Sequence, residues 1–416
     1  MRDFRPVLNK KYLFPILAFM AVAAVWFLGA ARGWAQEPEI TGMAAVLMDA
    51  QNGQVLFEKN SRARIFPAST TKVLTAVLAL EKCRLDEAVV LCEEAELAEG
   101  SSVGLKKGER LSLEDLLYAL LLSSGNDAAA AIACHVAGSV SAFAAMMNEK
   151  ALEIGARESH FTNPSGLPDP AHYSTAYDMA LIARYAMQNQ TFRKMVSTEQ
   201  KTIKREVPDA QTYLLNHNKL LWLYNGANGI KTGYTVEAGQ CLVSSAQRRG
   251  RELIASVMKS EGVNIWSDTE KLLDFGFSDF EPVVLAQAGK AVAEVSVAHG
   301  AGGPVLARVG SAFFYNFKRG EAPPIRQEAF LKKGLTAPVK AGDKVGELVF
   351  YRGEEEIGRT DLVADRDVRV SFWYKSVPWF CLLFGASVFW AVVRYRARKG
   401  ASGKWKKNRG QRRYVF

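Results

Sequence analysis

Three short motifs in a fixed order constrain the fold of this chain more than any other feature of its sequence. They are Ser69-Thr-Thr-Lys72, Ser124-Gly-Asn126 and Lys231-Thr-Gly233. Each motif is common alone, but their joint order is hard to obtain by chance. The fold must therefore bring together a helix start, a turn and a strand that lie far apart in the chain.

The residues around the motifs predict these elements. An apolar pattern that follows Pro67 predicts a long helix with Ser69 in its first turn or at its start, one helical turn before Lys72. A capping-box-like Ser112-Leu-Glu-Asp115 predicts a helix that stops at Ser124. An alanine-rich helix is expected to follow, to about residue 140, and a strand is expected after the Lys-Thr-Gly motif.

The residue types of the motifs suit acyl transfer through a serine that needs no histidine. Ser69 is the candidate nucleophile, at a helix start that favours developing negative charge. Lys72 is the candidate base, provided that burial and the nearby cation of Lys231 lower its pKa enough to leave it neutral. Ser124 can relay a proton between this base and the leaving group.

The remaining motif residues are candidates for holding the substrate. Asn126 can hydrogen-bond a substrate amide, and Lys231 with Thr232 suits a carboxylate. Gly233 lets a substrate lie against the strand edge as an added β-strand. The backbone N–H groups of the nucleophile and of Tyr234 are candidates for an oxyanion hole.

The formal net charge of +10 does not indicate a nucleic-acid partner, because the charge lies at the ends of the chain. The tail, residues 394–416, has ten basic residues and no acidic one. The first 35 residues are also basic, so the body between the two ends is mildly acidic. Charge distributed in this way reports membrane topology.

Residues 1–35 predict an export signal. Basic residues precede an uncharged, largely apolar run at 12–31, and Gly33-Trp-Ala35 is a small-x-small cleavage site. We expect Gln36 to be the new N-terminus, with an uncleaved membrane anchor as the alternative. Both outcomes place the following residues outside the cytoplasm.

Residues 376–393 predict a single transmembrane helix at the C-terminal end. This stretch has eighteen uncharged residues, with aromatic residues on both sides. The alternative is a buried core helix, but the basic block that follows favours the membrane. The catalytic body then faces out from the cell membrane, and the basic tail 394–416 lies in the cytoplasm near anionic lipid.

The histidine and cysteine patterns imply no metal and no cofactor. The five histidines never approach a ligand spacing such as His-x-x-x-His. Among the five cysteines, Cys83 and Cys92 are candidates for a disulfide, although single buried thiols are expected for most of them.

The body divides into two predicted domains. Residues 40–275 carry the motifs and begin with two strands, 43–50 and 54–59, that are joined by a turn at Asn52-Gly53. Residues 280–370 contain alternating apolar stretches separated by glycine-rich turns, which predicts a small β-rich domain with a spacer or docking role.

The three motifs, in their longer contexts, resemble those of the D-alanyl-D-alanine carboxypeptidases, the low-molecular-mass penicillin-binding proteins. These contexts are Phe66-Pro-Ala-Ser-Thr-Thr-Lys72, Leu122-Ser-Ser-Gly-Asn-Asp-Ala128 and Asn228-Gly-Ile-Lys-Thr-Gly-Tyr-Thr-Val-Glu-Ala-Gly239. The resemblance spans residues 40–275, and residues 280–370 resemble the second domain of the family.

The resemblance implies an α/β fold of the β-lactamase and DD-peptidase type, with an antiparallel sheet, flanking helices and a helical lobe. It implies a serine-type D-Ala-D-Ala carboxypeptidase, a hydrolase that removes the terminal D-alanine from peptidoglycan pentapeptide stems through an acyl-enzyme on Ser69. β-Lactams would bind covalently to the same serine. The motif positions that carry over from the family are Ser69, Lys72, Ser124, Asn126, Lys231 and Thr232.

The chain departs from the family pattern in two places. Some relatives place a carboxylate-binding arginine after the strand that follows Lys-Thr-Gly, whereas residues 264–267 contain none. Carboxylate binding is therefore expected from Lys231, Thr232 and Thr235. Relatives often end in an amphipathic helix, whereas this chain ends in a predicted membrane span.

Three other functions share features of this sequence. A serine β-lactamase is disfavoured because residues 163–178 contain no glutamate to position a deacylating water. A DD-endopeptidase or transpeptidase would use the same residues on a different bond or acceptor. A catalytically silent, membrane-anchored scaffold that binds the cell wall is disfavoured by the intact motif set.

Overall fold

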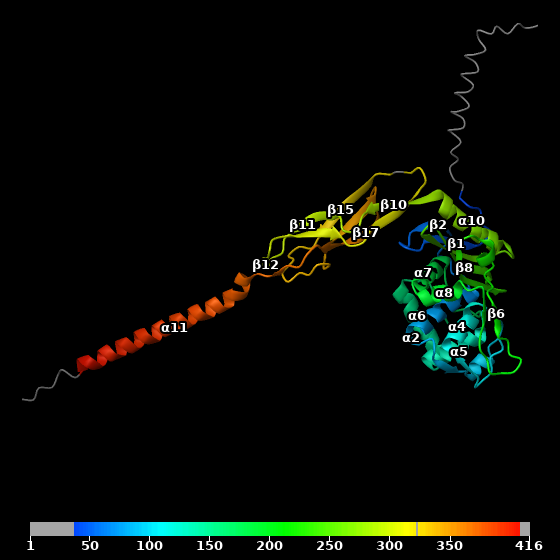
Figure 1. The fold of residues 1–416 in the computed structure, drawn as a ribbon, viewed down its shortest axis with the longest axis horizontal. Helices are drawn as coiled ribbons and strands as arrows, with labels where there is room; N and C mark the ends of the chain where they lie inside the picture. The colour runs from blue at the N-terminus through cyan, green and yellow to red at the C-terminus, as the bar shows by residue number, and fades with distance from the viewer. Residues whose placement is uncertain (1–36, 322, 408–416) are drawn as a thin grey trace, which may run out of the picture. The chain divides into compact units, whose positions relative to one another are not determined.

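The computed structural model describes residues 37–321 and 323–407. The predicted export signal lies outside the described residues, and so does the end of the basic tail. The chain separates into two compact units, with the boundary after Glu281 (Figure 1). Each unit is described by itself.

A five-stranded antiparallel sheet forms the centre of the first unit. In spatial order its strands are β2 (Val55–Lys59), β1 (Ala44–Asp49), β9 (Arg251–Ser260), β8 (Gly239–Arg248) and β7 (Ala227–Thr235). The predicted hairpin of β1 and β2 is confirmed, with Gly53 in its turn at φ +76°. Strand β7, which carries the Lys231 motif, lies at an edge of this sheet.

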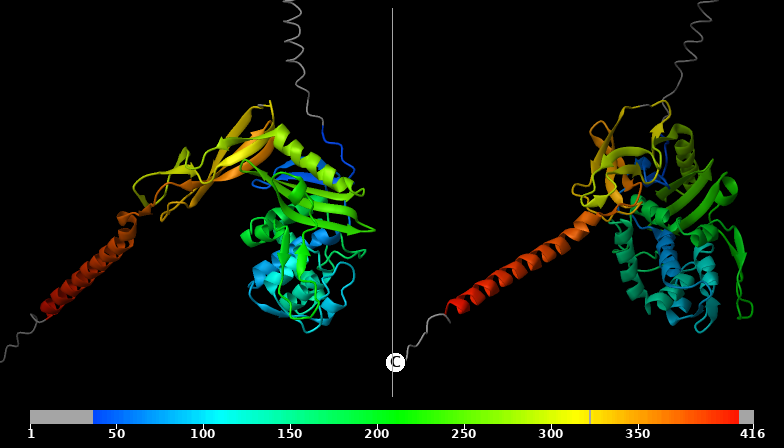
Figure 2. Two further views of the ribbon diagram at one scale, coloured as in Figure 1. Left: turned by 45° about the vertical axis from the view of Figure 1, so that its right-hand side comes forward. Right: turned by 60° about the vertical axis from the view of Figure 1, so that its left-hand side comes forward.

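Helices cover both faces of the sheet, as the two views in Figure 2 show. Helix α10 (Asn264–Asp279) packs on one face, where its Leu272 and Leu273 are completely buried. Helices α2 (Lys72–Lys82) and α7 (Ala176–Ala186) belong to the larger core on the other face. Burying one such leucine stabilises the fold by about 1.5–3 kcal/mol, so these two apolar cores hold the layers together.

A helical lobe continues the larger core. Its main helices are α4 (Leu113–Leu121), α5 (Asn126–Ala137), α6 (Val140–Ile154) and α8 (Gln190–Val196). The predicted cap at Ser112 is confirmed, because its hydroxyl accepts a hydrogen bond of 3.1 Å from the N–H of Asp115. Helix α5 ends slightly earlier than expected, because Gly138 at φ +80° caps it.

Short elements connect these layers. They are η1 (Ala68–Thr71), β3 (Ala88–Val90), α3 (Glu93–Glu96), β4 (Arg110–Ser112), β5 (Gln200–Thr202), β6 (Tyr213–Leu215) and α9 (Leu220–Leu223). Strands β3 and β4 pair with each other, as do β5 and β6.

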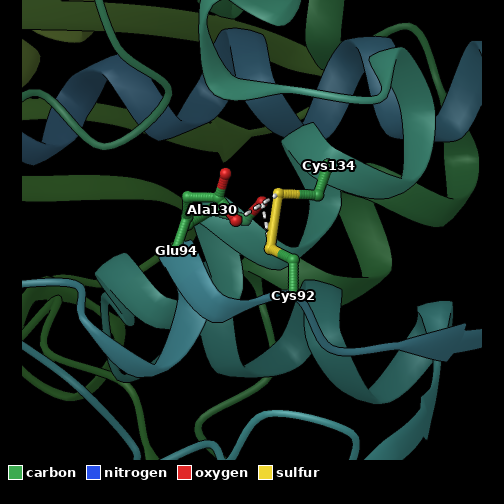
Figure 3. The surroundings of a disulfide bond; sticks show 4 residues. All are labelled: Cys92, Glu94, Ala130 and Cys134. Carbon is green, nitrogen blue, oxygen red and sulfur yellow. Dashed lines mark hydrogen bonds between the residues drawn. A yellow bond between two sulfur atoms is a disulfide. The ribbon is translucent and has the colours of Figure 1, made fainter.

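A disulfide between Cys92 and Cys134 closes the lobe (Figure 3). The candidate pairing of Cys83 with Cys92 is therefore wrong. Helix α5 packs against α3, and this packing brings the Cα atoms of Cys92 and Cys134 to 6.6 Å across 42 residues of sequence. Cys83 stays outside the disulfide.

The second unit is β-rich. Its main sheet has the spatial order β11 (Ala291–Val295), β13 (Val305–Val309), β17 (Glu355–Ala364), β16 (Lys344–Arg352) and β15 (Ile325–Leu331). Two smaller pairs join β10 (Phe280–Ala286) to β14 (Phe313–Lys318), and β12 (Gly300–Ala301) to β18 (Arg369–Val370). Val305, Val345 and Phe350 lie at the centre of its core, without any exposed surface.

The C-terminal helix α11 (Phe372–Lys407) includes the predicted span 376–393. Its segment Phe372–Lys399 has 28 residues with a mean hydropathy of 1.9 in its most apolar window, and none of that window is buried against the rest of the chain. This helix is long and apolar enough to cross a membrane.

Candidate active site

Ser69 lies in the short 3₁₀ turn η1, directly before α2. The predicted spacing is therefore confirmed, and the serine lies at the start of the helix, in the turn that leads into α2. Lys72 is the first residue of α2 and is completely buried. One turn of chain separates the two side chains, so they point into the same space.

Lys72 is held by three oxygens. Its Nζ atom lies 2.8 Å from Ser69 Oγ, 2.6 Å from Asn126 Oδ1 and 2.7 Å from the carbonyl oxygen of Ser165. These contacts come from three segments that are distant in sequence. The lysine is thereby fixed within proton-transfer distance of the serine hydroxyl.

Burial and a second cation lower the pKa of Lys72 well below its usual value. The larger cause is the loss of water around the ammonium group, and the charge of Lys231 adds to it. The carboxylate of Asp127 acts in the opposite direction. The balance favours a neutral amine, as the candidate base requires.

The second motif lies in the loop between α4 and α5. Ser124 is 4% exposed and has φ +60°, a conformation that is uncommon outside glycine. Its hydroxyl makes no hydrogen bond to another residue in the described part of the chain. This side chain is therefore available to a substrate or to a proton in transit.

Asn126 is the first residue of α5, and both the oxygen and the nitrogen of its side-chain amide already make hydrogen bonds. Its Oδ1 atom accepts the hydrogen bond from Lys72, and its Nδ2 atom donates to the carbonyl oxygen of Glu99. The sequence predicted a contact with substrate at this position. In the free chain its side chain holds Lys72, so a substrate amide would have to replace one of these partners.

Strand β7 brings the third motif to the same place. The side chain of Lys231 is 1% exposed, and its Nζ atom donates to the carbonyl oxygen of Thr232. Burial lowers the pKa of Lys231 to about 7. Tyr234, three residues further along the strand, is 60% exposed, so its ring is open to solvent.

Gly233 lies directly against the turn that carries the serine. A Cβ atom at this position would be 2.9 Å from the backbone nitrogen of Ser69 and 3.0 Å from that of Thr70. The sequence suggested that Gly233 makes room for a substrate strand. The structure adds that the glycine makes room for the backbone of η1 itself.

The sequence Asn163-Pro-Ser-Gly-Leu167 is part of the family resemblance, but sequence reasoning assigned no role in the site to this loop. The Oδ1 atom of Asn163 accepts hydrogen bonds from the backbone N–H groups of Ser165, Gly166 and Leu167. This arrangement presents the carbonyl oxygen of Ser165 to the lysine. The Asn-Pro-Ser-Gly sequence was the available signal, because asparagine organises such turns through its side chain.

A buried histidine supports the turn η1, which carries Ser69. His172 Nε2 lies 3.0 Å from Thr71 Oγ1, and its Nδ1 atom accepts from the N–H of Thr162. Burial lowers the pKa of His172 to about 4, so the ring is neutral at physiological pH. Because His172 contacts Thr71 and acts on Ser69 only through the turn, it is a positioning residue.

These contacts suit an active-site serine enzyme in which a lysine takes the place of the usual histidine base. The comparisons with known proteins agree. The family model of the D-alanyl-D-alanine carboxypeptidases matches residues 32–262, and that of the penicillin-binding protein 5 C-terminal domain matches residues 280–370. The chain belongs to the D-alanyl-D-alanine carboxypeptidase family.

Individual relatives support this assignment. The D-alanyl-D-alanine carboxypeptidase DacF of Bacillus subtilis (strain 168) is 34% identical over 333 residues, which are 78% of this chain and 85% of the relative. Penicillin-binding protein 5 from Haemophilus influenzae superposes with a TM-score of 0.68 at 30% identity, over 80% of this chain and 99% of that structure. A mutant of the Streptomyces K15 DD-transpeptidase gives a TM-score of 0.55 at 32% identity, over 58% of this chain and 99% of that structure.

The fold expected from the motifs is thereby confirmed, and so is the class of enzyme, a serine-type D-Ala-D-Ala carboxypeptidase. A covalent acyl-enzyme and the binding of β-lactams are general to this family.

Proposed function

We propose that Ser69 is the nucleophile and Lys72 its base in the removal of the terminal D-alanine from peptidoglycan pentapeptide stems. One observation carries the proposal: a completely buried lysine has its Nζ atom 2.8 Å from the serine hydroxyl. A neutral amine at this distance accepts the hydroxyl proton as the oxygen attacks the carbonyl carbon.

The reaction has two halves. In the first, Ser69 Oγ bonds to the carbonyl carbon of the penultimate residue, and the proton moves to Lys72 Nζ. The peptide bond then breaks, and D-alanine leaves after its nitrogen receives a proton through Ser124. In the second half, a water molecule attacks the ester and Lys72 takes its proton. Lys72 returns this proton to Ser69 Oγ as the ester bond breaks, and the shortened stem departs.

The backbone stabilises the intermediate in this proposal. The N–H groups of Ser69 and Tyr234 point at the oxyanion that forms on the attacked carbonyl. The close approach of Gly233 to η1 supports this role, because it brings the strand and the serine turn into direct contact. Each such donor contributes about 10²–10³-fold to the rate in related chemistry.

Strand β7 holds the substrate. As an edge strand, it has a side on which a peptide can add as a further strand. Lys231 and Thr232 face the terminal carboxylate, and Thr235 extends this surface. Asn126 completes the site by exchanging one of its present partners for the substrate amide.

The enzyme acts at the outer surface of the cell membrane in this proposal. Helix α11 crosses the bilayer once, and the basic tail lies on the cytoplasmic side. Both catalytic and β-rich domains, proposed at 40–275 and 280–370, then face the cell wall. The Cys92–Cys134 disulfide supports this location, because such bonds persist outside the cytoplasm.

The test is a fluorescent penicillin label on the full chain in detergent, beside Ser69→Ala, with release of D-alanine from a pentapeptide measured in parallel. We expect both signals in the parent chain and neither in the variant. Label without release would favour the transpeptidase alternative, which the likeness to the Streptomyces K15 enzyme supports. Absence of both signals from the folded parent chain would favour a silent scaffold.

A further inference from the structure

Three side chains that can bind a metal ion lie together at the C-terminal ends of α2 and α5. These are the ends of the two helices that are farthest from Ser69. The thiol sulfur of Cys83, a carboxylate oxygen of Glu87 and a ring nitrogen of His135 all lie within 4.8 Å of one another. Cys83 follows the last residue of α2, Glu87 lies in the next turn, and His135 is in the last turn of α5. The histidine is 48 residues from the glutamate, so no spacing in the sequence signals the cluster.

We propose that Cys83, Glu87 and His135 bind one divalent transition-metal ion, and that zinc is the best match. The set offers one sulfur, one oxygen and one nitrogen, all of which are ordinary zinc ligands. A thiolate and a carboxylate together neutralise the two positive charges of the ion. Hard cations such as calcium and magnesium are disfavoured, because they prefer oxygen ligands alone.

Glu87 and His135 are already in contact, and their geometry fits a zinc site. Glu87 Oε2 and His135 Nε2 lie 3.1 Å apart. Two ligands that are each about 2.0–2.1 Å from a tetrahedral ion lie roughly 3.3 Å from each other, so little movement is needed. The two side chains are 35% and 25% exposed, which leaves room for a water molecule as the fourth ligand.

Helix dipoles favour a cation at this point. The N-terminal ends of α2 and α5 meet where Lys72 binds Asn126, at 2.6 Å. Their C-terminal ends meet at Cys83 and His135, so the two helices run in the same direction. The negative ends of both dipoles therefore point toward the cluster.

The ligands are oriented before any ion arrives. The backbone N–H of Arg84 donates to Glu87 Oε1 at 2.8 Å, which turns the other oxygen toward the histidine. The guanidinium group of Arg84 pairs with Asp86, away from this carboxylate. The residue next to His135 is Cys134, whose disulfide fixes the end of α5.

The ion would act as a clamp and not as a reagent. Eleven residues of α2 separate its two ends, or about 16 Å at 1.5 Å per residue. At this distance the ion and its ligands cannot contact a substrate bound at Ser69. It would instead tie together the far ends of the two helices whose near ends hold Lys72 and Asn126.

The test uses the full chain in detergent, treated with a chelator and dialysed without reductant so that the disulfide stays intact. Cobalt(II) chloride is titrated first, and zinc chloride then displaces it. We expect one equivalent of cobalt, a thiolate-to-cobalt charge-transfer band, and a rise of several degrees in the thermal midpoint with saturating zinc. Cys83→Ser should remove the band and weaken zinc binding at least tenfold.

Two further variants and one control make the result decisive. Glu87→Gln and His135→Gln should each weaken zinc binding at least tenfold, and they decide the question if Cys83→Ser does not fold. Cys381→Ser removes a cysteine of α11 and should change nothing. Penicillin labelling of every variant reports folding separately from metal binding. No band in the parent chain, or the same affinity in all variants, would overturn the proposal and leave an ordinary His–Glu ion pair.

Discussion

Lys72 and Lys231 of the catalytic unit are 0% and 1% exposed, whereas the ion pairs of the β-rich unit lie at its surface. Lys344, for example, pairs with Glu347 while 42% of its side chain is exposed. Burying a lysine away from water is costly unless the group loses its charge. In the mechanism proposed above, a neutral Lys72 amine is the base, which gives the catalytic unit a use for a buried lysine that the β-rich unit does not have.

The strongest test of this contrast is Lys72→Arg. Arginine keeps the positive charge and cannot act as a base at accessible pH, so we expect acylation by fluorescent penicillin to slow by about 10²–10⁴-fold. Lys82→Arg, at the exposed end of the same helix, is the matched control and should acylate normally. A rate within tenfold of the parent chain for Lys72→Arg would show that the lysine is not the base.

Gly233→Ala tests the contact between strand β7 and the serine turn. The new methyl group would meet the backbone nitrogens of Ser69 and Thr70 at about 3 Å and displace the turn. We expect penicillin acylation to slow by roughly 10–100-fold, because misplacing a reacting group by about 1 Å has effects of this size. Gly385→Ala in helix α11 is the control, since its backbone has no positive φ and no atom lies within 4 Å of its new methyl group. Unchanged acylation in Gly233→Ala would contradict the close approach.

The pH dependence of the free energy of unfolding should reflect the lowered pKa of Lys231. Its pKa is about 7 in the folded chain and near the ordinary 10.5 when unfolded, so the unfolded state binds more protons between these values. The free energy of unfolding should therefore rise with pH in this window, by at most about 1.4 kcal/mol per pH unit from this group. Lys231→Met should remove that part of the slope, measured by urea unfolding at several pH values. Parallel slopes in the two proteins would argue against a lowered pKa.

The smallest effect is expected from Arg359→Ala in the β-rich unit. Arg359 pairs with Glu347 and Glu356 at the surface, with 55% of its side chain exposed. Exposed ion pairs contribute little, so we expect the thermal midpoint to change by about one degree or less and penicillin labelling to stay the same. A large drop in either quantity would break the contrast between the two units.

The sequence allowed prediction of the parts of the site that depend on local pattern. The spacing of Ser69 and Lys72, the cap at Ser112 and the β1–β2 hairpin all follow from periodicity and turn chemistry. The carbonyl oxygen of Ser165 could not be found in this way, because it meets Lys72 across 93 residues. Its role depends on how the lobe packs.

The prediction that Cys83 pairs with Cys92 was wrong for the same reason. Cys83 and Cys92 are close in sequence, but the packing of α5 against α3 places Cys134 beside Cys92. That same packing leaves Cys83 with Glu87 and His135 as neighbours. Contacts between helix ends are set by the tertiary structure, and no single-sequence pattern encodes them.

The low pKa of Lys231 has a consequence for the energetics of substrate capture. Above pH 7 this side chain is largely uncharged in the free enzyme, because burial lowers its pKa to about 7. In the proposed mode of binding, the substrate carboxylate lies beside Lys231 and would raise its pKa again, so each captured stem would draw a proton from the surrounding buffer. The heat released on binding would then depend on the ionisation enthalpy of the buffer, and alkaline conditions would weaken capture before they affect the chemistry at Ser69.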